Sequence, residues 1–130
     1  MTLLQQKMAD SNARRLAKSP SKKPNRIGTF VYVAGVVGDL TDDTYYYEVL
    51  RKFAKRERQL RKLGYSVINP MTLVKRGTPW HEAMKKCIIA MCKCSFISPL
   101  PDVTKSKGAM IEMQLAEHLK ITILIPSKIN

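Results

Sequence analysis

The residues best placed to do chemistry are Ser106, Gly108 and Glu112, in the stretch 104–119, TKSKGAMIEMQLAEHL, which has a polar entry followed by a helical pattern. Ser106 is a good N-cap residue, because its hydroxyl can accept from the free N–H groups of the first turn. Most of the helix is apolar, yet it contains Glu112, a residue type that is almost never buried without a partner. Residues four apart share one helix face, so Gly108 and Ala116 leave space beside the Glu112 carboxylate. The pattern predicts an acid that faces a ligand; the alternative is a glutamate that points to solvent or pairs with a nearby lysine.

The start of the same helix has the features of a phosphate site. The free N–H groups and the dipole of a helix N-terminus favour an anion, and Lys105 and Lys107 flank Ser106 with positive charge. We therefore expect Ser106 and Lys107 to contact an anionic part of the ligand.

Strands and helices alternate along the chain, which predicts a parallel sheet with helices on both faces. Apolar periodicity and turn residues place strands at 29–34, 65–68, 95–98 and 120–126, and helices at 43–63, 80–92 and 106–119. The last strand, KITILIP, is apolar enough to be expected in the interior. The predicted fold class is α/β, a flavodoxin- or Rossmann-like three-layer sandwich with a mainly parallel sheet of four or five strands.

In open α/β sheets, ligands bind at the edge formed by the carboxyl ends of the strands. The segments expected at this edge are the loops at 35–39, 69–78 and 99–107 and the start of the Glu112 helix. The first loop contains Gly35, Val36 and Asp39, but it matches neither a GxGxxG sequence nor a Walker loop. It therefore predicts a wall of a binding site without predicting a dinucleotide or a triphosphate.

Four segments resemble the nucleoside 2-deoxyribosyltransferase-like superfamily. They are VYVAG at 31–35, LRKLGYSVINP at 60–70, PW at 79–80 and LPDVTKSKGAMIEMQLAEHL at 100–119. The resemblance covers residues 29–126 and is greatest to an uncharacterised branch found in phages and mobile elements. Within it, the Ser106-x-Gly108-x-x-x-Glu112 spacing is similar to the motif of the deoxynucleoside 5′-monophosphate N-hydrolases.

The resemblance implies a reaction at the N-glycosidic bond of a nucleotide or nucleoside, by hydrolysis or by deoxyribosyl transfer. It makes Glu112 the nucleophile, or the group that stabilises an oxocarbenium-like sugar, as carboxylates do in glycosidases. It places Ser106 and Gly108 at the sugar–phosphate end, and Gly35 and Val36 under the base and sugar. The resemblance also implies a homodimer or larger assembly, because relatives complete the site from a neighbouring subunit. No cofactor and no metal is expected.

Three positions depart from the pattern of that superfamily. The family carries one aspartate that handles the leaving base and another at the start of the third strand, where this chain has Cys87 and Ser95. Val36 stands where a proline is usual. Because a thiol takes part in hydrogen bonding only weakly, Cys87 would deliver a proton to the base poorly. A second hypothesis is therefore a nucleotide-binding module with impaired catalysis, in which Cys87 still lines the pocket.

Positive charge favours a third hypothesis, a basic nucleic-acid-binding protein. The net charge is +13, and residues 1–27 hold seven lysines and arginines against one aspartate. The Pro, Ser and Lys content of this segment predicts a flexible basic arm before a domain at 28–130. Seven more basic residues lie between Arg51 and Lys62. Basic surfaces attract phosphates, but the chain has no recognised nucleic-acid motif, and a solvated helix face is the alternative.

The cysteines and the hydropathy bear on the cellular setting. Three cysteines within eight residues are not a disulfide framework, and they favour a reducing, cytoplasmic location. With His81 or His118 they could supply metal ligands, but their spacing matches no strong zinc pattern. No apolar run reaches the about 18 residues of a membrane span and the N-terminus lacks the apolar core of a signal peptide, so no membrane partner is expected.

Overall fold

The structure is a computed structural model, and it describes residues 26–126. The basic arm predicted at 1–27 lies outside these residues, except that Arg26 and Ile27 belong to the first strand. The elements before the midpoint are β1 (Arg26–Ala34), α2 (Asp43–Lys62), β2 (Tyr65–Ile68) and α3 (Pro70–Leu73). The later ones are α4 (Trp80–Met91), β3 (Phe96–Pro99), the 3-10 turn η1 (Val103–Lys105), α5 (Lys107–His118) and β4 (Thr122–Ile123).

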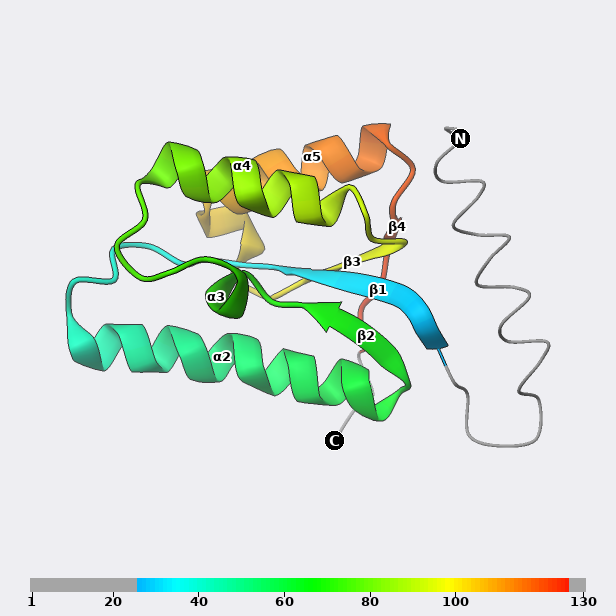
Figure 1. Ribbon diagram of the computed structural model, residues 1–130, viewed down its shortest axis with the longest axis horizontal. Helices are drawn as coiled ribbons and strands as arrows, with labels where there is room; N and C mark the ends of the chain where they lie inside the picture. The colour runs from blue at the N-terminus through cyan, green and yellow to red at the C-terminus, as the bar shows by residue number, and fades with distance from the viewer. Residues whose placement is uncertain (1–25, 127–130) are drawn as a thin grey trace.

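The described strands form one parallel sheet in the order β2-β1-β3-β4. Helix α2 covers one face of this sheet, and α4 and α5 cover the other (Figure 1). The predicted α/β three-layer fold with a parallel sheet is therefore confirmed. The strand order reverses direction between the neighbours β1 and β3, and such a reversal is where open α/β sheets form ligand sites.

Strand β1 is the centre of the core, as its dense β-branched and aromatic sequence predicts. Its side chains alternate between the two faces. Val31 and Val33 pack in the cluster under α2, whereas Tyr32 and Ala34 pack in the cluster under α4 and α5. All four residues are fully buried. This alternation places the Tyr32 side chain on the same side of the sheet as α5.

Helix α2 begins and ends as its sequence predicts. The Asp42 carboxylate accepts from the Tyr45 N–H at 2.8 Å, and the helix stops before Gly64, whose positive φ of 93° suits glycine. The buried side of the helix carries Val49, Phe53 and Leu60. The described part of the chain contains no helix with the length and apolar character needed to cross a membrane.

The prediction of a long, buried last strand is wrong. Strand β4 comprises only Thr122 and Ile123, and both are exposed. Ile121 alone packs into the core under α4 and α5, while Ile125 is 59% exposed. The reason is that β4 lies at the edge of the sheet, where β3 is its one neighbour among the described strands. An apolar run does not by itself distinguish a central strand from an edge strand.

The segment after β2 also differs from its prediction as a plain loop. The Asn69 side chain accepts from the Met71 N–H at 2.9 Å, and Pro70 occupies the first turn of α3. Asparagine as N-cap followed by proline is a helix-start signal, so the same pair that ends β2 also begins a single helical turn.

Candidate functional site

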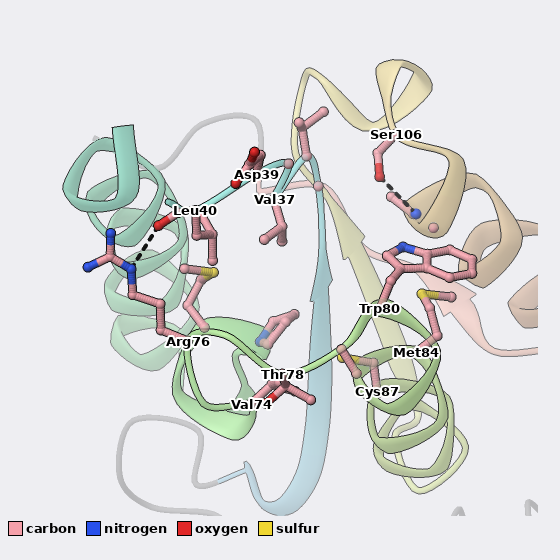
Figure 2. Close-up of a pocket in the computed structure, with 18 of the residues that line it drawn as sticks. Val37, Asp39, Leu40, Val74, Arg76, Thr78, Trp80, Met84, Cys87 and Ser106 are labelled. Carbon is pink, nitrogen blue, oxygen red and sulfur yellow. Dashed lines mark hydrogen bonds between the residues drawn. The ribbon is translucent and has the colours of Figure 1, made fainter. Parts of the chain in front are cut away.

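A cavity of about 790 Å³ opens at the carboxyl edge of the sheet, within the size range of about 300–1,000 Å³ that small-molecule sites occupy. Its walls come from the loop after β1, the segment from α3 to α4, the inner side of α4 and the start of α5 (Figure 2). All eight residues predicted for the site line it: Gly35, Val36, Asp39, Cys87, Ser106, Lys107, Gly108 and Glu112. The topology brings them together because each lies at or near the carboxyl end of β1 or β3, or on a helix beside those ends.

Glu112 lies in this cavity and is only 5% exposed. Its Oε2 atom accepts a hydrogen bond from the Tyr32 hydroxyl at 2.6 Å. Among the described residues, no lysine, arginine or histidine nitrogen lies within 4.0 Å of its carboxylate. Both alternatives, a solvent-facing glutamate and a lysine pair, are therefore wrong. Glu112 lines the cavity, and its contact with a ligand stays a prediction.

The surroundings of Glu112 shift the protonation of three neighbouring groups. Burial raises the pKa of Glu112 to about 7, against the opposing effect of the Tyr32 hydrogen bond, so the carboxyl titrates near neutral pH. Burial and the nearby Glu112 charge raise the pKa of Tyr32, which keeps its proton as a donor. Burial also raises the pKa of Cys87, although Tyr32 partly opposes this shift. Cys87 is therefore a thiol rather than a thiolate at neutral pH.

The N-terminus of α5 is built as predicted. Ser106 Oγ accepts from the Ala109 N–H at 3.1 Å, drawn as a dashed line in Figure 2. A Cβ atom at Gly108 would lie 2.9 Å from Sδ of Met84, so the glycine allows α4 to approach α5 closely. The column of Gly108, Glu112 and Ala116 is buried, in agreement with the helical spacing.

The loop after β1 is held by an ion pair that the sequence did not predict. Asp102 Oδ1 accepts from the Val36 N–H at 3.1 Å, and its Oδ2 lies 2.7 Å from the Lys52 ammonium. Lys52 also donates to the Val36 carbonyl at 2.6 Å. A Cβ atom at Gly35 would lie 2.6 Å from Leu100. The loops that follow β1 and β3 are thus packed against each other and locked at the Val36 backbone.

Arg76 holds the opposite wall of the cavity. Its Nε atom donates to the Leu40 carbonyl at 2.7 Å, as Figure 2 shows, and its Nη2 pairs with Asp43 at 2.9 Å. The guanidinium also lies 4.1 Å from the centre of the Tyr46 ring. On the other side of the cavity, Trp80, Met84 and Cys87 project from α4 (Figure 2). Arg76 therefore joins two cavity-lining loops that are far apart in the sequence.

Sequence reasoning missed Tyr32, Lys52 and Asp102 as parts of this site. The Tyr32 hydroxyl carried a usable signal, because a tyrosine in the middle of a buried strand needs a hydrogen-bond partner. Lys52 looked like one of several solvated charges on its helix. Its partner is 50 residues away in the sequence, so no local pattern identifies the pair.

The cysteines are all free, with Cys87 and Cys94 buried. Cys94 Sγ donates to the Ala90 carbonyl at 3.4 Å, as a packed thiol near the end of a helix does. Within residues 26–126, no group of three His, Cys, Asp or Glu side chains is arranged to hold a metal ion. Ser95 does not line the cavity, whereas Cys87, the other position where the superfamily has an aspartate, does.

Comparison with known proteins gives a family but no activity. A family model described as a domain of unknown function, DUF4406, matches residues 29–125. No curated protein matches the chain. The resemblance to the nucleoside 2-deoxyribosyltransferase-like superfamily stays a prediction, because the family description assigns no function. Since the match covers well over half of the sequence, the chain belongs to the DUF4406 family.

Proposed function

We propose that this protein cleaves the N-glycosidic bond of a nucleotide or nucleoside, with Glu112 as the nucleophile or as the stabiliser of the sugar cation. The observation that carries the proposal is the position of Glu112, a buried carboxylate that faces a ligand-sized cavity and is oriented by Tyr32. Perturbed acids in clefts mark functional sites more often than other acids do.

The reaction needs a group that responds to positive charge on the sugar. As the C1′–N bond breaks, charge develops on the sugar, and a preorganised carboxylate in a water-poor site stabilises it strongly. Glu112 Oε2 is occupied by the Tyr32 hydroxyl. Oε1 accepts no hydrogen bond from a described residue, and it is the oxygen we assign to C1′. Water as the acceptor then gives hydrolysis, and a second base gives transfer.

The start of α5 supports a nucleotide rather than a nucleoside. Ser106 uses its oxygen to accept from Ala109, so its hydroxyl proton is left to donate to a phosphate oxygen. Lys105 and Lys107 line the cavity beside it and are exposed. The first-turn N–H groups and the helix dipole add to this positive potential.

Two expectations accompany this function. The resemblance implies a homodimer or larger assembly, and the cysteine content favours the reducing conditions of the cytoplasm. Both remain predictions. Light scattering coupled to size-exclusion chromatography tests the first, and fractionation of the cells that make the protein tests the second.

A nucleotide-binding module without turnover is the second candidate function. The protonation of Cys87 favours it, because burial raises the pKa of this thiol and a weak donor in that position gives little help to a leaving base.

The third candidate, nucleic-acid binding, loses part of its basis on α2. Three of the basic residues there make intramolecular contacts: Lys52 with Asp102, Arg56 with Ser98, and Arg61 with Glu57. The basic arm still allows this function. Because β1 begins at Arg26, the test is deletion of residues 1–25, which should leave the melting temperature nearly unchanged and weaken DNA binding at low salt. Unfolding of the domain would instead make the arm structural.

Base release decides between enzyme and binding module. Purified protein is incubated with each deoxynucleoside 5′-monophosphate, and free base is separated and quantified. Glu112→Gln is the matched variant, because it keeps the size and an acceptor for Tyr32 but cannot attack C1′. We expect it to lower base release on the order of 10³-fold or more while binding is largely retained, since the carboxylate acts mainly on the transition state. If the wild type binds nucleotides but releases no base, the binding module is favoured. If it neither binds nucleotides nor releases base, both proposed nucleotide functions are excluded.

A further inference from the structure

We infer that the preferred substrates of this site are nucleotides whose base carries a fixed positive charge, such as an N-ribosyl pyridinium or an N7-alkylated purine. The inference rests on the proposed N-glycosidic function and adds the substrate class. It comes from two features of the cavity. No effective proton donor for a leaving base lies near Glu112, and the Glu112 carboxylate has no cationic partner among the described residues.

The first feature is the lack of an effective proton donor near Glu112. A neutral base leaves well only if it receives a proton, and a positioned acid contributes about 10²–10⁴-fold to such a step. Tyr32 already donates its hydroxyl proton to Glu112 at 2.6 Å. Cys87 is a buried thiol, and burial raises its pKa. Neither group is an acid that gives up a proton readily at neutral pH.

The remaining ionisable side chains of the cavity do not fill this role. Asp39 accepts from the Thr41 N–H at 3.0 Å, and this contact lowers the pKa of Asp39, so it carries no proton at neutral pH. The ring of Tyr46 lies under the Arg76 guanidinium. The others are exposed cations at the cavity: Lys75, Arg76, Lys105 and Lys107. A base that is already cationic needs no proton donor, because it departs as a neutral molecule.

The second feature is the distribution of charge. Within the described part of the chain the Glu112 carboxylate has no cationic partner, and a buried charge without one is unfavourable. A cationic ring beside it supplies the missing charge and also favours the ionised, nucleophilic form of the carboxyl. The lysines at the start of α5 suit a phosphate at the other end of the same ligand. A nucleotide with a cationic base matches both.

The reaction balances with water as the only co-reactant. The electron pair of the C1′–N bond leaves with the ring nitrogen, so the cationic base becomes a neutral heterocycle. Glu112 Oε1 stabilises or bonds to C1′, and a water oxygen then forms the new bond to C1′. The second proton of that water is released to solvent, and the Glu112 carboxylate is regenerated.

Two matched substrate pairs test the inference with the full chain. Nicotinamide mononucleotide is compared with its reduced form, which has nearly the same shape but no ring charge, and 7-methylguanosine 5′-monophosphate is compared with guanosine 5′-monophosphate. Base release is measured at pH 7.5, and binding is followed by the fluorescence of Trp80, the single tryptophan, which lines the cavity. We expect the charged member to be cleaved at least about 10²-fold faster, and its tighter binding to be lost in Glu112→Gln.

Each outcome has a meaning. A charged preference in one pair only supports the inference and identifies the pyridinium or the purine as its source. Equal rates within both pairs, or faster cleavage of neutral nucleotides, would overturn the inference and leave the N-glycosidase function standing. No release from these four compounds or from neutral deoxynucleotides would overturn both.

A variant that supplies the missing acid gives an independent check. Cys87→Asp should raise the rate on guanosine 5′-monophosphate and reduce the preference for its 7-methyl form, whereas Cys87→Ser, of similar size, should change the preference little. Equal effects of the two substitutions would count against the inference. Circular dichroism establishes that each variant is folded, and the wild-type substrate pairs decide the question if Cys87→Asp is not.

Discussion

Two carboxylates, Glu112 and Asp102, lie at the same edge of the sheet, and their surroundings shift their pKa values in opposite directions. Glu112 is 5% exposed, and its one described hydrogen-bond partner is Tyr32; burial raises its pKa to about 7. Asp102 has a side chain 29% exposed and pairs with Lys52. Burial would raise the pKa of Asp102, but Lys52 and the Val36 N–H together lower it. The comparison teaches that environment separates two similar acids: the one without a cationic partner among the described residues faces the cavity, and the one paired with Lys52 holds a loop.

Removing the charge of Glu112 should have the largest effect on stability. Its pKa rises from an ordinary 4.5 to about 7 in the folded protein, so between these values the folded protein holds a proton that the unfolded chain has lost. Stability therefore falls as pH rises through this window, by on the order of 3 kcal/mol at about 1.4 kcal/mol per pH unit. Because glutamine does not ionise, Glu112→Gln should be more stable than the wild type by about that amount at pH 8.

Urea denaturation at pH 4.5 and pH 8 measures this difference. Near pH 4.5 both the glutamine and the protonated glutamate are neutral, so the two proteins should have similar free energies of unfolding. The same gap at both pH values would show that Glu112 is stabilised by something other than its protonation, and the contrast with Asp102 would fail.

Tyr32→Phe should have an intermediate effect. The Tyr32 hydroxyl favours the ionised form of Glu112, so its loss should raise the pKa of that carboxyl further and move the acid limb of the pH–rate profile to higher pH. A lost hydrogen bond to a charged group costs about 1.5–3 kcal/mol, and we expect the lower part of this range at pH 8. Tyr47→Phe is the control, because Tyr47 is 54% exposed on α2. An unmoved acid limb would mean that Tyr32 does not tune Glu112.

Lys52→Met should have a smaller effect on stability than Glu112→Gln or Tyr32→Phe, and a clearer one on ligand binding. The pair is partly exposed, so solvent screens it, and we expect a loss of about 1 kcal/mol. Because the pKa of Asp102 is lowered in the folded protein, its ion pair stabilises the fold above the ordinary pKa of 3.8. This stabilisation is lost as pH falls through the pKa that Asp102 has in the folded protein. The difference between Lys52→Met and the wild type should therefore shrink in acid, the reverse of the Glu112 behaviour.

Arg61→Met is the matched control for Lys52→Met. It breaks the pair with Glu57 on the same helix, away from the cavity, where Arg61 is 53% exposed, so its cost should be a few tenths of a kcal/mol. Nucleotide affinity should fall only in Lys52→Met, because Lys52 and Asp102 fix the Val36 backbone. Equal affinities of the two variants would show that the ion pair does not shape the cavity.

The parts of the site that follow local rules were predictable. The Ser106 cap and the column of Gly108, Glu112 and Ala116 depend on contacts within one or two helical turns. The strand–helix alternation predicted a parallel sheet, and the ends of its strands then predicted which loops meet at the cavity. These inferences need only the period of the helix and the direction of the strands.

The parts of the structure that depend on residues distant in the sequence were not predictable. Tyr32 and Glu112 are 80 residues apart, and the exposed position of β4 follows from its place at the edge of the sheet, which no stretch of sequence encodes on its own.

The sequence by itself therefore determined the fold class, the position of the acid and the capped helix that presents it, because helix and strand periodicity are properties of neighbouring residues. Only the tertiary structure decided that Glu112 has no cationic partner among residues 26–126 and a pKa raised to about 7, while Asp102 pairs with Lys52 and has a lowered pKa. The physical reason is that desolvation and ion pairing depend on which side chains the packed sheet and helices bring together in three dimensions.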